Sequence, residues 1–170
     1  MHPVEVEEAL QTLTILCDSR EQQNARAAKR YAAFGCPYRR EKLDFGDYSA
    51  VVTLRDGHVF DMRQFVAIER KMDLDEVCGC YTHGRARFAR EFERAALVGA
   101  KLYLLIENAS WESVANGRYR SRMAPQALMA SLLAWLARYD CQVIMCSSST
   151  TGKMIRNILY REAKERLMNL

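Results

Sequence analysis

Three charged residues stand at the end of an apolar segment in the middle of the chain. Residues 66–68 are Val-Ala-Ile, and Glu69-Arg70-Lys71 follow directly. A buried strand has no structural need for such an ending, because unpaired charge near a core is costly. Side chains alternate along a strand, so Glu69 and Lys71 project to one face and Arg70 to the other. A carboxylate beside an ammonium can hold a divalent cation and a polarised water, which suits phosphodiester hydrolysis.

Acidic residues also follow other apolar segments. Asp18 and Glu21 come after the apolar residues 13–17, and Asp47 follows Gly46 ahead of residues 49–54. Ligand sites in open α/β sheets gather where strands end at one edge, so we expect these acids to meet Glu69 there. Mg²⁺ prefers oxygen ligands and keeps several waters, so two or three carboxylates suffice to hold it.

The cations near these acids suggest further roles. Lys71 would orient the attacking water, help to deprotonate it, or stabilise the charge that develops on the phosphate. Arg20 and Arg70 could bind phosphate through a planar fork that Lys lacks. The alternatives are structural: Glu69 and Lys71 would form an edge salt bridge, and the two arginines would only pair with the acids.

The elements that must position these residues alternate between strands and helices. Apolar segments predict buried strands, and 3.6-residue spacing predicts amphipathic helices. Two of the strands are almost wholly apolar, which favours an α/β fold with a central mixed β-sheet flanked by helices on both faces. The expected strands are 13–17, 38–43, 49–54, 58–60, 65–69, 101–106 and 142–146, and the expected helices are 24–34, 73–77, 85–98, a helix beginning at Pro125, and 153–170.

Composition places the chain in a broad class. It has 170 residues, 49% of them hydrophobic, which allows one domain with a substantial core. Residues 1–12 are interpreted as an acidic N-terminal lead and residues 13–170 as the domain. We expect no membrane segment, because no apolar run of about 18 residues exists. The scattered cysteines and the absence of an apolar signal segment predict an intracellular protein with reduced thiols.

Basic residues gather in short clusters, with a formal net charge of +4 for the whole chain. Such clusters favour a polyanionic partner, although a solvated helix or loop face is the plain alternative. In the cluster at residues 118–122, Tyr119 separates two arginines, a pattern that suits single-stranded DNA. The candidate DNA-binding residues are Arg85 and Arg87, and then Arg118, Arg120 and Arg122.

Three other signals carry less weight. Cys78 and Cys80 have one residue between them and no second Cys or His pair nearby, which argues against a structural zinc site. His83, in an expected loop with two glycines, is a possible general base, but a loop histidine is more often incidental. Trp111 and Trp135 are interpreted as packing residues.

Several of these motifs occur in one order that resembles the XPF/Hef-type structure-specific endonucleases. Gly46-Asp47, followed by Glu69-Arg70-Lys71 and Asp75, is similar to the signature of that family. The resemblance extends over roughly residues 13 to 160 and includes the upstream acidic motif at 18–21, Gly84-Arg85, and the strand ending in Glu107.

The resemblance implies a restriction-endonuclease-like core of the PD-(D/E)xK type. Asp18, Asp47 and Glu69 would be ligands of Mg²⁺ or Mn²⁺, and Lys71 would activate the water. The family cuts branched DNA such as flaps, forks and crossovers, so the implied activity is a Mg²⁺-dependent endodeoxyribonuclease. The remaining residues carried over as part of the catalytic site are Arg20, Glu21 and Arg70, as partners that hold phosphate or each other, and Asp75 in support.

The resemblance also implies partners and context. The family dimerises through its nuclease domain, and the last two helices have broad apolar stripes, so we expect a homodimer through them. Family members usually carry a helix-hairpin-helix module after the nuclease domain. We see none here, and this predicts a stand-alone version in the cytoplasm of a prokaryotic or phage-infected cell. The interval between Asp47 and Glu69 is long and contains an expected Asp56-Gly57 hairpin.

Three other functions are compatible with parts of this pattern. One is a different PD-(D/E)xK nuclease, such as a resolvase-like or restriction-like enzyme. Another is a non-catalytic, DNA-binding subunit of a nuclease dimer, although such a subunit should have lost acids that are intact here. The last is a protein-interaction module, for which DNA binding would be absent or insensitive to salt.

Overall fold

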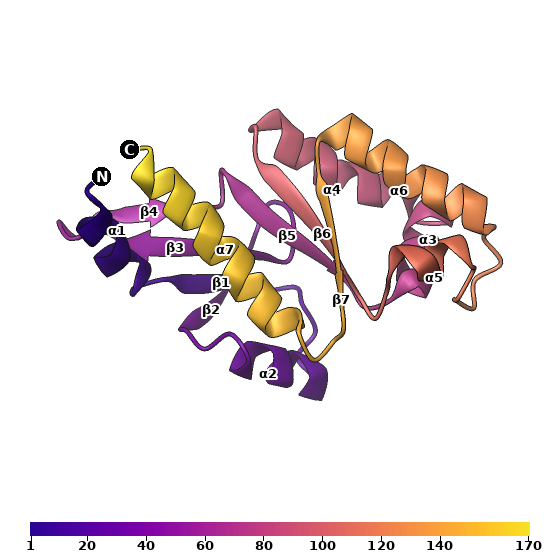
Figure 1. The fold of residues 1–170 in the computed structure, drawn as a ribbon, viewed down its shortest axis with the longest axis horizontal. Helices are drawn as coiled ribbons and strands as arrows, with labels where there is room; N and C mark the ends of the chain where they lie inside the picture. Colours follow the sequence, from indigo (N-terminus) through magenta and orange to yellow (C-terminus); the bar gives the residue numbers. More distant parts are fainter.

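A seven-stranded mixed sheet forms the centre of the molecule (Figure 1). The computed structural model describes residues 1–170. The strand order is β2-β1-β3-β5-β6-β7, and β4 pairs with β3. The strands are β1 (Thr14–Asp18), β2 (Tyr38–Glu41), β3 (Tyr48–Thr53), β4 (Val59–Asp61), β5 (Val66–Lys71), β6 (Lys101–Glu107) and β7 (Gln142–Cys146).

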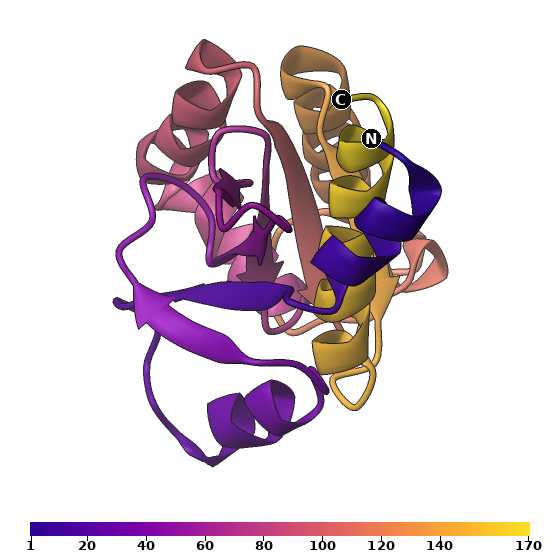
Figure 2. The same ribbon diagram turned by 90° about the vertical axis from the view of Figure 1, so that its left-hand side faces the viewer.

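Seven helices accompany the sheet, and two hydrophobic clusters lie between them and its faces. The helices are α1 (Pro3–Leu10), α2 (Ala25–Ala32), α3 (Leu74–Thr82), α4 (Arg85–Leu97), α5 (Trp111–Ala115), α6 (Pro125–Tyr139) and α7 (Thr151–Met168). One cluster contains residues of α1, α2 and α7, and the other contains residues of α3, α4 and α6. Figure 2 shows α7 and α4 on opposite sides of the central strands. The structure confirms the predicted mixed sheet with helices on both faces.

Strand β5 shows how the alternation of side chains divides the core. Val66 and Ile68 belong to the cluster under α7, whereas Ala67 belongs to the cluster under α4. Glu69 is still buried, and the strand becomes partly exposed at its last two residues, Arg70 and Lys71. Strand β5 pairs in parallel with β6 and antiparallel with β3, and the latter ladder has the single register pair Tyr48 and Ile68.

Two segments in the first half of the chain are more regular than the sequence indicated. The lead at residues 1–12 contains the helix α1, and its Val6, Ala9 and Leu10 lie in the same core cluster as α7. The expected short helix at 73–77 extends to Thr82, so the expected loop at 79–84 is mostly helical. Leu74, Val77, Cys78 and Tyr81 are all buried, and this helical spacing sustains the longer helix.

The last two helices use their apolar stripes within the chain. Leu128, Leu132 and Trp135 of α6 are fully buried, and so are Ile155, Leu159 and Leu167 of α7. Only Leu133 of the stripe residues is well exposed, at 51%. All six cysteines are free thiols. None of the helices combines the length and apolarity required to cross a membrane.

Candidate active site

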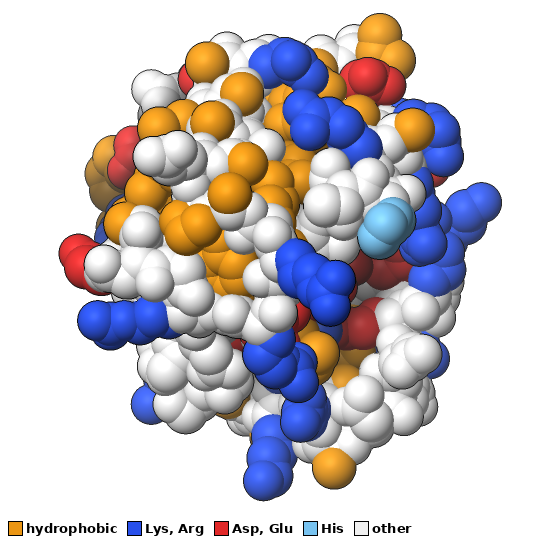
Figure 3. All heavy atoms as spheres, turned by 90° about the vertical axis from the view of Figure 1, so that its right-hand side faces the viewer, with side chains coloured by type: hydrophobic (Ala, Val, Ile, Leu, Met, Phe, Trp, Pro, Cys, Tyr) orange, Lys and Arg blue, Asp and Glu red, His pale blue; other side chains and the backbone are white.

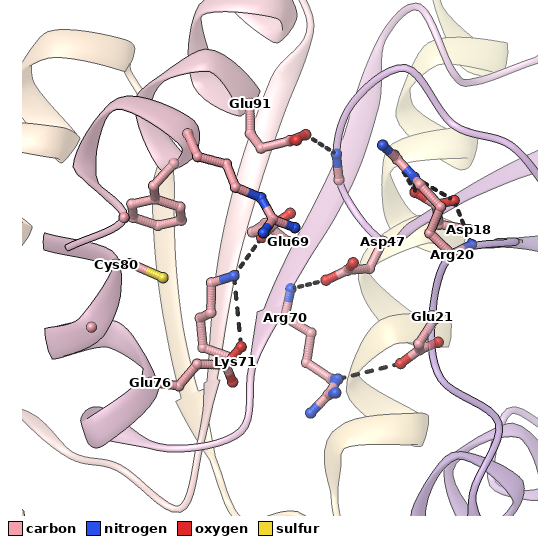
Figure 4. A pocket seen from close by; sticks show the side chains of 15 residues that line it. Asp18, Arg20, Glu21, Asp47, Glu69, Arg70, Lys71, Glu76, Cys80 and Glu91 are labelled. Atoms are coloured by element: carbon pink, nitrogen blue, oxygen red, sulfur yellow. Dashed lines mark hydrogen bonds and ion pairs between the residues drawn. The ribbon is translucent and has the colours of Figure 1, made fainter.

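The ends of β1 and β5, the residues before β3, and the helices α3 and α4 enclose a polar pocket of about 550 Å³. Asp18, Arg20, Glu21, Asp47, Glu69, Arg70 and Lys71 all line it. The sequence therefore predicted correctly that these residues gather in one place. Figure 4 shows their side chains around the pocket. On the face shown in Figure 3, acidic side chains lie at the bottom of a hollow, and Lys and Arg side chains surround it.

The backbone fixes Asp47 beside β5. Gly46 has φ +70°, and a Cβ atom at this position would lie 2.9 Å from the Cβ of Ala67, so the close approach requires glycine. The Asp47 amide donates to the carbonyl of Ile68 at 2.8 Å. Its carboxylate Oδ2 accepts a hydrogen bond from the Arg70 amide at 2.7 Å. Asp47 is thus held next to the end of β5, although 22 positions separate it from Glu69 in the sequence.

Glu69 and Lys71 form a tight pair on one face of β5. The Lys71 Nζ lies 2.6 Å from Glu69 Oε1, and the two side chains are only 11% and 9% exposed. Burial alone would lower the pKa of Lys71, but the Glu69 carboxylate outweighs it and holds that pKa above its usual value. The Glu69 carboxylate thus favours the ammonium form of Lys71, which can orient a water or stabilise negative charge.

The carboxylates of the half-buried Asp47 and the buried Glu69 are incompletely compensated. Burial raises the pKa of Asp47, and the negative charge of Glu69 raises it further. Burial also raises the pKa of Glu69, although Lys71 partly offsets this effect. A divalent cation between them would stabilise both ionised carboxylates. It would supply more positive charge than the Lys71 ammonium and the Arg70 amide provide. The residues present therefore fit such an ion.

Asp18 lies in the same pocket but is engaged elsewhere. Its carboxylate accepts from Arg20 Nε at 2.9 Å and from the Arg20 amide at 3.0 Å, and the guanidinium also pairs with it. Arg20 additionally donates to the carbonyl of Leu43 at 2.9 Å. No group of three or more His, Cys, Asp or Glu side chains converges closely enough to hold a metal ion. Of the three expected ligands, Asp47 and Glu69 lie together, whereas Asp18 is paired to Arg20 (Figure 4).

Glu21 and Arg70 belong to a buried ion-pair network. Glu21 accepts hydrogen bonds from Arg30 and from two tyrosine hydroxyls, including that of Tyr31 at 2.7 Å. Arg70 lies 3.6 Å from Glu21 and 3.4 Å from Glu107, and Arg30 lies 3.8 Å from Glu107. Glu107 ends an apolar strand, the same signal that identified Glu69. The sequence did not identify Arg30 as a site residue, because the direction of its side chain depends on how α2 packs against the sheet.

Two glutamates that line the pocket were not predicted. Glu91 of α4 accepts from the Gly46 amide at 3.3 Å, and Arg94 one turn later donates to the carbonyl of Asp44 at 2.7 Å. Glu76 of α3 accepts from the Met72 amide at 2.7 Å and lies 3.9 Å from Lys71. Glu91 is four residues after Arg87, which also lines the pocket, and this helical spacing was the available signal.

Several other predicted residues do not line the pocket. The Asp75 carboxylate accepts from the Arg120 and Ser121 amides at 2.8 and 2.7 Å, so it anchors the 116–124 loop. Arg120 also pairs with Asp75 at 3.0 Å. The Arg85 guanidinium lies 5.2 Å from the ring centroid of Trp135. The exposed residues Arg118, Arg122 and His83 do not line the pocket.

Comparisons with known proteins identify the family and the fold of the chain. The family model described as "ERCC4 domain" matches residues 17–158. No curated protein sequence matches the chain. The solved structure of XPF from Aeropyrum pernix is 18% identical with a TM-score of 0.60, over 91% of this chain and 69% of that one. A structure of the same protein in complex with DNA is also 18% identical, with a TM-score of 0.61, over 90% and 66%.

The structural likeness concerns the fold, and the family match includes both strand ends that carry the acids and the glycine–arginine segment before α4. The fold is that of the XPF nuclease domain, a restriction-endonuclease-like architecture. The chain belongs to the ERCC4 domain family.

Proposed function

We propose that this protein is a metal-dependent endonuclease that hydrolyses phosphodiester bonds of DNA near branches or junctions. Membership of the ERCC4 domain family supports the class of structure-specific DNA endonuclease. The observation that carries the proposal is the convergence of Asp47, Glu69 and Lys71 in one pocket, where Glu69 is buried, Asp47 is half-buried, and the pKa of each carboxylate is raised. The structure of the Aeropyrum pernix protein with DNA supports DNA as the polyanionic partner.

Asp47 and Glu69 would hold Mg²⁺ or Mn²⁺, and the resemblance adds Asp18 as a third ligand. When bound, such an ion polarises the scissile phosphate, neutralises transition-state charge and supplies an activated water. Glu69 keeps the Lys71 ammonium in the pocket, where it donates a hydrogen bond to the attacking water or to a phosphate oxygen.

The arginines of the pocket would bind the phosphates on either side of the cleaved bond. Arg70 is directed by Glu21 and Glu107 and is 18% exposed, so it presents part of its guanidinium to the pocket. Arg87 reaches the same pocket from α4. Charged hydrogen bonds of this kind position a phosphodiester without reading the bases, as a structure-specific enzyme requires.

A cleavage assay on labelled DNA tests the proposal. Flap, fork, four-way junction and plain duplex substrates are incubated with the purified chain in Mg²⁺, in Mn²⁺, and in EDTA. We expect cutting near branches that requires the metal, and a loss of about a thousandfold or more in Asp47→Ala with the fold retained. Retained activity in Asp47→Ala would remove the site, and full activity in EDTA would remove the metal.

The substrate series also separates the alternatives. Equal cutting of plain duplex and branched DNA would indicate a restriction-like enzyme, and cutting restricted to four-way junctions would indicate a resolvase. DNA binding by the parent without cleavage of any substrate would indicate a non-catalytic subunit. Binding that does not weaken as salt increases would contradict a phosphate interface.

We also propose that the protein forms a homodimer through α6 and α7. The resemblance supports this, and the exposed Leu133 on α6 supplies an apolar contact. Sedimentation equilibrium of the parent and of Leu133→Glu tests the proposal. A dimer that dissociates in Leu133→Glu is expected, and a parent that stays monomeric at high concentration would contradict it.

A further inference from the structure

A second hollow lies on the other side of the buried arginine network. It has a volume of about 620 Å³ and is bounded by α2, the end of β6 and the segment between β7 and α7. Figure 1 shows α2 next to the start of α7. We call this hollow, with its lining side chains, the α2 groove. Its lining residues are Arg26, Lys29, Arg30, Ala33, Met72, Asp73, Glu107, Asn108, Arg120, Ser148, Ser149 and Gly152.

The α2 groove and the active-site pocket share a wall. Arg30 and Glu107 line the groove, whereas Glu21 and Arg70 line the pocket. These four side chains are joined by the ion pairs of the buried network. The two hollows therefore adjoin across this network, and Met72 of the groove directly follows Lys71 of the pocket in the sequence.

Two cations of the groove have no acidic partner. Arg26 and Lys29 are exposed and form no ion pair, and Arg26 donates a hydrogen bond to Met72 Sδ at 3.0 Å. Many other cations in the chain do pair, such as Arg63 with Glu41 and Asp61. Arg26 and Lys29 are three residues apart on one helix face, so their charges add at the groove.

The opposite side of the groove is a well-defined polar surface. Asn108 has φ 52°, and its Oδ1 accepts from the Ser148 amide at 3.0 Å. This conformation costs energy for a residue other than glycine, and the tie to Ser148 maintains it. Gly152 lets α7 approach α2, because a Cβ atom there would lie 2.4 Å from the Arg30 carbonyl. Ser148 and Ser149 line this side of the groove, and the Ser149 hydroxyl lies 2.8 Å from that of Ser147.

We propose that the α2 groove binds the sugar–phosphate backbone of the DNA strand that continues beyond the cleaved bond. The inference rests on the proposed function and adds a second contact region for the substrate. Cations and hydroxyls are the groups that contact phosphates. No aromatic side chain lines the groove, so it offers no stacking platform for bases and its contact is independent of sequence.

Binding of fluorescent forked DNA, in buffer without divalent metal, tests the inference. The variant Arg26→Ala/Lys29→Ala removes both unpaired cations, and Lys42→Ala/Arg55→Ala removes two exposed cations that also form no ion pair and lie elsewhere. We expect the first variant to bind roughly tenfold more weakly, with a salt dependence reduced by about two phosphate contacts. The control variant should remain close to the parent.

The length of the fork arm gives a second readout. For the parent, affinity should increase as the single-stranded arm lengthens until the arm spans the α2 groove. For Arg26→Ala/Lys29→Ala this dependence should disappear. Ser148→Glu, which places a negative charge in the groove without removing a cation, should weaken binding in the same way. Thermal unfolding of each variant verifies that the fold is intact.

The outcomes distinguish this inference from the proposed function. A parent that neither binds nor cuts any DNA would overturn the proposed function itself. A parent that cuts branched DNA while Arg26→Ala/Lys29→Ala binds like the parent would overturn the α2 groove alone. An equal loss in the control variant would also overturn it, because the effect would then follow net charge rather than position.

Discussion

The ends of β1 and β5 carry the same short pattern and use it differently. Asp18-x-Arg20 and Glu69-x-Lys71 each place an acid two residues before a cation. At β1 the arginine side chain is 55% exposed and wraps the carboxylate with several hydrogen bonds. At β5 both side chains are almost buried, and the lysine makes a single short contact with the carboxylate.

The two strand ends differ in how many carboxylate oxygens remain free to bind a ligand. The forked guanidinium of Arg20 satisfies both oxygens of Asp18, whereas Lys71 satisfies one oxygen of Glu69. Glu69 is also next to Asp47, whose pKa is raised by burial and by this neighbour. The β5 end is thus the one that a cation would stabilise most, and the β1 end is already compensated.

Removal of each cation should produce the largest contrast. We expect Lys71→Ala to lower the cleavage rate by roughly 10²- to 10⁴-fold, because it deletes a fixed charge at the reacting phosphate. Arg20→Ala should lower the rate by about tenfold or less, in line with one exposed phosphate contact. Single-turnover cleavage of a forked substrate measures both. Equal losses of cleavage rate would show that Lys71 and Arg20 contribute equally to catalysis, contrary to this comparison.

The loop that carries Asp47 provides the next test. Glu91→Ala removes the acceptor of the Gly46 amide, and we expect turnover to decrease about tenfold, because Asp47 is then held less firmly. Glu91→Gln retains an acceptor oxygen and should recover most of the rate. The mid-point concentration of Mn²⁺, from a titration followed by calorimetry, should increase in Glu91→Ala. Similar results for Ala and Gln would indicate that the charge of Glu91, rather than its hydrogen bond, is what matters.

Arg20→Ala has a second, smaller expected effect. Without its partner the Asp18 carboxylate becomes available, so Mn²⁺ should bind several-fold more tightly, as a site with one more oxygen ligand does. Calorimetric titration of the parent and variant with Mn²⁺ measures this change. Weaker binding in Arg20→Ala would mean that Arg20 holds Asp18 in position for the ion instead.

A pair far from both strand ends should give the smallest effect. Burial alone would raise the pKa of Glu162, but hydrogen bonds from Lys101 and Tyr103, each 2.6 Å long, outweigh it and lower that pKa. The folded-state pKa is below the unfolded one, so this contribution is present above the unfolded pKa and lost as pH falls through the folded value.

Glu162→Gln should therefore reduce the free energy of unfolding at neutral pH by less than about 1 kcal/mol, since Lys101 is partly exposed. Urea unfolding of the parent and variant at neutral and at acidic pH measures the difference, and it should vanish at acidic pH. Cleavage of forked DNA should be unchanged. A difference that persists in acid would contradict the assigned role of Glu162.

Much of the fold was predictable because hydrophobic periodicity is a local property. The strands β1, β5, β6 and β7 are apolar runs that end in polar residues, and β6 ends in Glu107 by the same rule as β5. The helix α4 was predicted to within one residue, from Arg85 to Leu97. The length of α3 was underestimated because Gly79 suggested a loop, whereas packing of Tyr81 carries the helix further.

The side-chain geometry of the site was less accessible, because it depends on tertiary packing. The sequence placed Asp18 with the other acids, but could not show that Arg20, two residues away, would turn back onto it. Arg30 and Glu91 lie on helices, and which helix face meets the pocket follows from the docking of α2 and α4. The apolar stripe of α6 suggested a dimer contact, but most of it, including Trp135, is buried in the core of the same chain.

The two halves of the sheet are joined by a single register pair, between β3 and β5, and the active site lies beside this junction. Strands β2, β1, β3 and β4 form one half of the sheet, and β5, β6 and β7 form the other. Asp47 directly precedes β3 in the first half, and Glu69 lies on β5 in the second. A cation bound by both would therefore connect the two halves where the fewest strand residues pair. Loading with metal should therefore slow amide exchange at Ile68 and its neighbours, tying the rigidity of the sheet to the readiness of the site.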